Sequence, residues 1–220
     1  MARWPRTCED YRTMKPIKSL LVLAVILAPG FAGAQGYYGG GGYAAPLPGG
    51  FHNRMGRLMS GVSVGIGGMH DGGSGITNCD QSCDYNPLAV EVDGHLGGML
   101  SPRFALMAEL QVNAQTVHSD FINGDTVLSQ SALMIAGQFW VTPQLWIKGG
   151  IGFAHLDAQD DYGPTQNFGG GGAVMAGAGF ELLSARFFAV DLQARIIEGT
   201  YHGLDDNITS GTLGVGLNWY

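Results

Sequence analysis

The chain has 220 residues, 37 of them glycine, with 45% hydrophobic and 13% charged residues and a formal net charge of −7. This acidic balance argues against nucleic acid as a partner, because phosphate backbones are bound by basic surfaces. The length is enough for one domain of ordinary size preceded by a leader.

The N-terminal segment has the residue order of a secretion signal. Lys15 and Lys18 precede an apolar run over residues 20–28, and an Ala-Gly-Ala tripeptide follows it. We predict a signal peptide over residues 1–34, with Met14 as an alternative start. The apolar run is shorter than the ~20 residues of a membrane-spanning helix, which disfavours the alternative of an anchor.

Residues 35–56 combine Gly-Tyr repeats with prolines. This composition makes an ordered element costly in backbone entropy, so we predict a flexible periplasmic leader. Cleavage of the signal would remove two of the 18 acidic and five of the 11 basic residues, which makes the remaining chain still more acidic.

From residue 58 to the C-terminus, the chain consists of runs that alternate apolar with polar or small residues. In one run, Leu106 and Leu110 fall on one face and Glu109 and Gln111 on the other. A period of two predicts a strand, and each run covers the ~9–11 residues with which a tilted strand crosses a bilayer. The eight predicted strands are approximately Leu58–Gly68, Leu88–Leu100, Phe104–Val117, Val127–Val141, Leu145–His155, Ala173–Leu183, Phe187–Gly199 and Ile208–Trp219.

The connections between these runs alternate strictly in length. Short connections at 100–103, 141–144 and 183–186 alternate with longer ones at 69–87, 118–126, 156–172 and 200–207. Membrane barrels have short periplasmic turns and longer external loops, and only a helix or a closed barrel pairs every backbone group in lipid. The predicted fold is therefore all-β, an eight-stranded antiparallel up-and-down transmembrane β-barrel over residues 57–220.

Large aromatic residues gather at the strand ends, as in the girdles at membrane interfaces. Those beside the short turns are Phe104, Phe139, Trp140, Trp146, Phe180, Phe187, Phe188, Trp219 and Tyr220, and a thinner set near the long loops is Phe121, Phe153, Phe168 and Tyr201. The alternative is that these rings pack in the core of a soluble barrel. The long connections carry ten aspartates and neither Lys nor Arg, so the predicted external surface is strongly negative.

On these features, residues 57–220 resemble the OmpA/OmpX-like family of small outer-membrane barrels. The resemblance implies a porin-like monomer in the outer membrane of a Gram-negative bacterium, surrounded by outer-membrane lipid. It also implies that the barrel-insertion machinery reads a terminal aromatic residue, here Tyr220. The apolar phase of the last strand, from Leu213 to Trp219, is displaced by one residue from the phase usual in that family.

Strand parity directs a set of polar residues to the inside of the barrel, opposite the apolar faces. These residues are Glu91, Asp93, His95, Glu109, Lys148, Glu181, Asp191 and Arg195. An eight-stranded barrel is just wide enough for side chains to fill it, and enclosed charges must pair or keep water. We predict a polar plug around Lys148 and Arg195, with a narrow ion or proton path as the alternative.

Cys79 and Cys83 lie in the first long connection. An exported loop passes through an oxidising compartment, so we predict a local disulfide between them. A C-x3-C metal pair is the alternative, although zinc sites usually show more ligands at recognisable spacing.

Four histidines that follow outward-going strands each precede an aspartate by one to three residues. The pairs are His70 with Asp71, His118 with Asp120, His155 with Asp157 and His202 with Asp205. Imidazole and carboxylate together suit a transition metal, and carboxylates alone suit calcium or magnesium. Because His and Asp are also common in polar loops, we predict no cofactor, and a divalent cation at the outer loops is the alternative.

The nearest approach to a catalytic arrangement is His118-Ser119-Asp120, whose adjacent residues on a strand would point to opposite faces. We therefore predict no enzyme. The predicted function is a structural or surface-interaction role, in which the acidic external loops bind an extracellular ligand of unknown identity. A lipid A-modifying enzyme and a narrow small-solute or ion channel are the alternatives.

Overall fold

The computed structural model describes residues 54–72, 74–75, 88–119, 124–160, 166–185, 187–202, 204 and 207–220. The predicted signal peptide, the leader up to residue 53 and the loop cysteines Cys79 and Cys83 lie outside these residues. The strands are β1 (Leu58–Asp71), β2 (Ser74–Gly75), β3 (Ala89–Ser101), β4 (Phe104–Ser119), β5 (Gly124–Trp140), β6 (Leu145–Asp160), β7 (Gln166–Ser184), β8 (Phe188–Gly199) and β9 (Ile208–Trp219). In the described ranges, no helix is long and apolar enough to cross a membrane.

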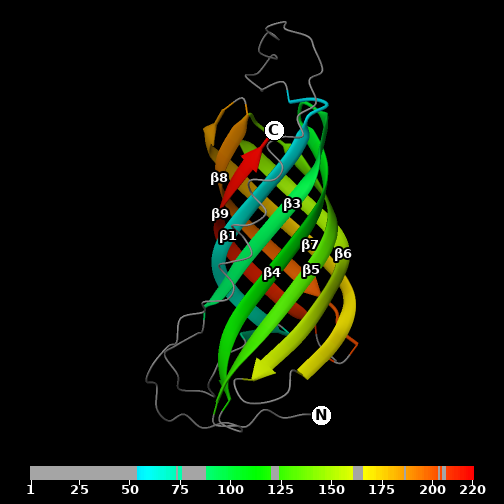
Figure 1. Ribbon diagram of the computed structural model, residues 1–220, viewed down its shortest axis with the longest axis vertical. Coiled ribbons are helices and arrows are strands. Elements are labelled where there is room, and N and C mark those ends of the chain that lie inside the picture. Colours follow the sequence, from blue (N-terminus) through cyan, green and yellow to red (C-terminus); the bar gives the residue numbers. More distant parts are fainter. Residues whose placement is uncertain are drawn as a thin grey trace, which may run out of the picture.

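The strands form one antiparallel sheet that closes on itself (Figure 1). Each long strand pairs with its neighbours in chain order, and β1 also pairs with β9, from Ser60 opposite Trp219 to Asp71 opposite Ile208. The two-residue β2 pairs with the end of β1. The predicted closed eight-stranded antiparallel barrel is confirmed, and closure leaves every long strand with two partners.

Side chains alternate between the two faces of the barrel wall, as a period of two requires. Along β8, Asp191, Gln193 and Arg195 are buried, whereas Leu192 and Ile196 are exposed. The other long strands repeat this alternation, with Leu, Ile, Val and Phe on the exposed face. The barrel therefore has an apolar outer wall, and its interior combines charged and amide side chains with a cluster of buried methionines, alanines and larger apolar side chains.

The strands continue further at the long-loop end than the apolar runs predict. β6 ends at Asp160 instead of His155, and β7 begins at Gln166 instead of Ala173. The hydrogen bonds of an antiparallel ladder join backbone groups and need no apolar side chain. Glycines 170–172 therefore pair with β6 although their sequence shows no alternation, and Gly169 lies at a shift in the register.

Four aromatic residues that the sequence assigns to the girdles point inward instead. Trp140, Trp146 and Tyr220 at the short-turn end and Tyr201 at the long-loop end are buried, whereas Phe139 is exposed. The girdle assignment is wrong for these four residues. Their rings carry an N–H or O–H group that finds a partner in the polar interior, which phenylalanine cannot do.

Candidate functional site: the polar interior of the barrel

The side chains that strand parity directs inward lie inside the barrel, each no more than 9% exposed. They are Glu91, Asp93 and His95 on β3, Glu109 on β4, Lys148 on β6, Glu181 on β7, and Asp191 and Arg195 on β8. The strands β1, β5 and β9 add buried uncharged polar residues, namely Ser63, Gln130, Gln138, Ser210, Thr212 and Asn218. Together these residues form a polar column inside the barrel.

At the short-turn end, four residues form what we call the base cluster: Arg54, Trp140, Glu181 and Tyr220. Arg54 Nη1 and Nη2 donate to the two oxygens of Glu181 at 2.9 and 3.2 Å. Trp140 Nε1 donates to Glu181 Oε1 at 2.8 Å, and the Tyr220 hydroxyl donates to the same oxygen at 3.3 Å. The guanidinium also lies over the Tyr220 ring, 3.7 Å from its centroid. Both oxygens of Glu181 thus accept hydrogen bonds at the short-turn end of the barrel, whereas Arg54 Nε has no hydrogen-bond partner among the described residues.

Tyr220 acts in the base cluster as a neutral hydroxyl. Burial, and then the negative charge of Glu181, raise the pKa of Tyr220 well above its usual value. The hydroxyl therefore keeps its proton and remains a donor to Glu181. The C-terminal aromatic residue of the chain is thus an interior group, and Trp219 is the last residue on the outward face.

Sequence reasoning assigned Arg54 to the leader and missed its insertion into the barrel. Arg54 precedes the first strand, so strand parity gives it no direction. Backbone hydrogen bonds from Gly56 N to Met99 O at 2.8 Å, and from Met99 N to Arg57 O at 2.9 Å, hold this segment against β3. One signal was available: the interior residues predicted from parity include five carboxylates but only two permanent cations, so a further cation was needed.

Asp191 is held next to the base cluster by two donors. Trp146 Nε1 and Asn218 Nδ2 donate to its Oδ2 oxygen at 3.2 and 2.8 Å. Lys148 Nζ lies 5.3 Å from the centroid of the Trp146 ring. The indole fits there because Gly179 has no side chain: a Cβ atom at Gly179 would lie 2.2 Å from Trp146 Cζ2.

Six titratable side chains meet in the middle of the barrel and form what we call the central cluster. Its members are Glu91, Asp93, His95, Glu109, Lys148 and Arg195. Arg195 Nη1 donates to Glu91 Oε1 at 2.7 Å and lies 3.3 Å from both Asp93 Oδ2 and Glu109 Oε1. Lys148 Nζ donates to Glu109 Oε2 at 3.0 Å, and Thr212 Oγ1 donates to Glu91 Oε2. Every carboxylate of this cluster therefore lies beside a cation, as burial of charge requires.

Toward the long-loop end, the interior becomes neutral and is filled by amides, hydroxyls and apolar side chains. Asn113 Nδ2 donates to Ser210 Oγ at 3.0 Å, and Ser210 Oγ donates to Gln130 Oε1 at 2.7 Å. Gln130 Nε2 in turn donates to the Tyr201 hydroxyl at 2.7 Å. Burial raises the pKa of Tyr201, so its hydroxyl group stays neutral and adds no charge to this end of the column.

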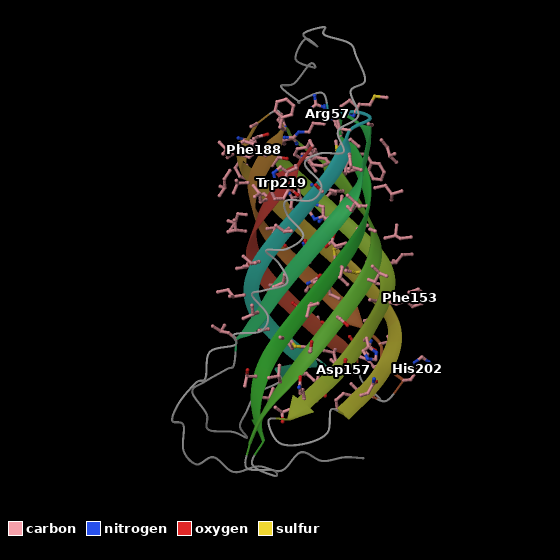
Figure 2. All side chains as sticks on the ribbon, viewed as in Figure 1. Arg57, Phe153, Asp157, Phe188, His202 and Trp219 are labelled. Carbon is pink, nitrogen blue, oxygen red and sulfur yellow. The ribbon has the colours of Figure 1, made fainter. Side chains whose placement is uncertain are left out.

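The predicted rim residues lie at the opposite end from the short turns. Figure 2 shows Asp157 and His202 at one end and Arg57 and Trp219 at the other. His155 Nε2 lies 3.3 Å from Asp157 Oδ1, and both side chains are partly exposed.

The rim histidines have local partners. Asn167 Nδ2 lies 3.1 Å from His155 Nε2, and His202 Nδ1 contacts the carbonyl oxygen of Gly170. His70 and Asp71 are exposed at the end of β1. The side chain of His118 and the residues Asp120 and Asp205 lie outside the described residues.

The contacts of the described histidines give no activated nucleophile. His155 contacts a carboxylate and an amide, and His202 contacts a backbone carbonyl. None of these contacts activates a hydroxyl group for attack. In the described part of the chain, only Asp93, His95 and Glu109 form a group of three potential metal ligands. What the interior offers chemically is therefore the binding of cations or protons.

No protein-family model and no curated protein matches the chain, whereas solved structures of small barrels do. Ail, the attachment invasion locus protein of Yersinia pestis, aligns over 74% of this chain and 99% of its own, with 14% identity and a TM-score of 0.47. OprG from Pseudomonas aeruginosa aligns over 76% and 97%, with 9% identity and a TM-score of 0.41. Neisserial surface protein A aligns over 74% and 96%, with 10% identity and a TM-score of 0.51, a likeness that shows a shared fold.

Proposed function

We propose that the chain is an outer-membrane β-barrel with a structural or surface-interaction role through its acidic loops. One observation carries the proposal: the wall is apolar outside, and the charged residues in the middle of the strands are enclosed. Among the residues that the structure describes, 28 large apolar side chains are at least 37% exposed, and they lie on the outward faces or at the ends of the strands. Soluble monomers rarely expose a continuous apolar surface of more than a few hundred Å². Hydrocarbon chains are the surroundings that fit such a wall.

The two ends of the barrel give its orientation in this proposal. The short turns face the periplasm and the long loops face outward, as in other outer-membrane barrels. The long-loop end carries exposed acidic residues such as Asp71 and Asp157. A negative surface suits a basic extracellular ligand, or divalent cations that bridge it to anionic lipid.

The proposal is tested by placing a charge on the outer wall. Ile151 is 69% exposed and lies within β6, whereas Val141 is 45% exposed and lies just beyond β5. In a bilayer, Ile151→Lys should lower the free energy of unfolding by about 2–4 kcal/mol, and Val141→Lys by about 0–1 kcal/mol, because the cost depends on depth. Urea unfolding in phospholipid vesicles measures both.

A wall that faces water would tolerate both lysines equally, so equal and small losses would overturn the proposal. Recovery of the wild-type protein in the outer-membrane fraction, with heat-modifiable migration on gels, is the matching measurement on the native chain. Recovery in the soluble periplasmic fraction would also contradict it.

A second candidate function, a narrow ion path, is favoured by the polar column that runs along the interior. The base cluster opposes it, because the Arg54 side chain occupies the inner mouth. Currents across planar bilayers decide between them: Lys148→Met should leave the conductance unchanged if the interior is a static plug. A new or altered current would favour the channel.

A further inference from the structure

We propose that the central cluster binds one divalent first-row transition metal ion at Asp93, His95 and Glu109. One ligand atom from each of these residues lies within 4.8 Å of the others. Such spacing brings all three within reach of a single ion after small side-chain shifts, since metal–ligand bonds are about 2.0–2.2 Å long.

The sheet register creates this grouping. Asp93 and His95 are two residues apart on β3 and so share the inner face, and Glu109 on β4 is the direct partner of His95. Asp93 Oδ1 lies 3.4 Å from His95 Nδ1 and accepts a hydrogen bond from Ser63 Oγ at 3.1 Å.

Three buried polar atoms of these residues have no hydrogen-bond partner among the described residues. They are Asp93 Oδ2, His95 Nε2 and Glu109 Oε1, all on side chains that are more than nine-tenths buried. Buried polar atoms are rarely left without a partner.

The two cations of the central cluster make their hydrogen bonds to other atoms, although Arg195 also forms ion pairs with two of these three atoms. Arg195 makes its short hydrogen bonds elsewhere, to Glu91 Oε1 at 2.7 Å and Gln193 Oε1 at 3.2 Å. Its contacts with Asp93 Oδ2 and Glu109 Oε1 are longer, at 3.3 Å, and lie outside hydrogen-bonding geometry. Lys148 is bonded to the other oxygen of Glu109.

The net charge of the interior also favours a bound cation. The buried charged residues described are five carboxylates and three permanent cations, which leaves two negative charges uncompensated when His95 is neutral. Enclosed charge without compensation is costly, and one divalent cation would neutralise the column. Protonation of interior groups would do the same, so the experiment must separate a metal ion from protons.

The donor set selects the kind of metal. One imidazole nitrogen with two carboxylate oxygens suits zinc, iron or manganese, whereas calcium and magnesium prefer oxygen ligands alone.

Gly61 on β1 leaves space for the His95 ring, because a Cβ atom there would lie 2.5 Å from His95 Nε2.

The test uses Co²⁺ as a visible probe. The protein is unfolded with a chelator and refolded in detergent with Co²⁺, and then Zn²⁺ is added as a competitor. We expect one Co²⁺ per chain with ligand-field absorption that Zn²⁺ removes and Mg²⁺ does not. His95→Gln and Glu109→Gln should each weaken binding at least tenfold, as loss of one ligand does.

The matched control replaces His70, His155 and His202 by Gln and should bind as the wild type does, because those side chains lie at the rim. Absence of Co²⁺ absorption, or its loss in the rim control, would overturn the proposal. Since the interior variants could fail to fold, X-ray absorption of the Zn²⁺-loaded wild type is the second measurement. A first shell without a single imidazole would also overturn the site.

Discussion

The base cluster and the central cluster use the same residue types in opposite ways. In the base cluster, one carboxylate meets one guanidinium, and the indole and phenol complete the hydrogen bonds of Glu181. In the central cluster, three carboxylates meet two permanent cations, and three ligand-type atoms have no hydrogen-bond partner among the described residues.

This difference suggests different roles for the two clusters: the base cluster closes one end of the barrel, and the central cluster can bind a cation. Both oxygens of Glu181 already accept hydrogen bonds, so this carboxylate has little left to offer a cation, and its contribution is to fix the segment that brings Arg54 into the mouth. A cluster with excess negative charge has capacity for one more cation.

Removal of Arg195 should be the most costly change in the interior. Arg195→Met leaves Glu91, Asp93 and Glu109 with Lys148 as the one remaining permanent cation of the central cluster. We expect a loss of about 3–5 kcal/mol in the free energy of unfolding, because breaking a buried pair leaves charge uncompensated. Urea unfolding in lipid vesicles measures it.

The control for this change removes a negative charge as well. Adding Asp93→Asn to Arg195→Met should recover part of the loss, since one carboxylate fewer then needs a cation. A double variant that is less stable by the full sum of its single changes would show that the carboxylates do not share Arg195.

Removal of Arg54 should cost less, because the base cluster retains other donors to Glu181. In Arg54→Met, the Trp140 indole and the Tyr220 hydroxyl still donate to the carboxylate. We expect a loss of about 1.5–3 kcal/mol, the range for hydrogen bonds to charged groups. A double-mutant cycle with Glu181→Gln measures the coupling energy between Arg54 and Glu181. A coupling energy near zero would show that the residues of the base cluster do not stabilise the barrel together.

A glycine pair on neighbouring strands tests how tightly the central cluster is packed. A Cβ atom at Gly61 would lie 2.5 Å from the His95 ring and 2.6 Å from Asn218 Oδ1, whereas one at Gly94 would have no atom within 4 Å. Gly61→Ala should cost about 1–2 kcal/mol through overpacking, and Gly94→Ala should cost less than about 0.5 kcal/mol. Equal effects on unfolding in vesicles would mean that His95 moves freely.

Much of this architecture is predictable from the period of the sequence alone. Alternation identified the long strands and directed residues such as Lys148 and Glu181 inward, because a strand leaves each side chain only two faces. Alternation fails where that constraint ends. Arg54 lies before the first strand, and the glycine run 169–172 has no side chains whose pattern could reveal it as part of β7.

The aromatic residues show a second limit of sequence reasoning. Trp and Tyr carry both an apolar ring and a polar group, so composition alone does not tell a girdle residue from an interior donor. Their hydrogen-bond partners tell them apart: Trp140 and Trp146 donate to Glu181 and Asp191, each two strands away along the wall, over sequence separations that no local pattern encodes.

Substitutions at the rim should change stability least, because water solvates and screens the charges there, whereas buried charges need partners within the protein. His155 and Asp157 lie 3.3 Å apart, with side chains 43% and 34% exposed, so solvent screens their attraction. Asp157→Asn should change the free energy of unfolding by less than about 1 kcal/mol, and less still at high salt. A loss comparable to that of Arg195→Met would mean that the rim holds a site as demanding as the central cluster. Because an exposed pair can be that costly to break only through a bound third partner, such a result would direct the search for a metal to the outer loops.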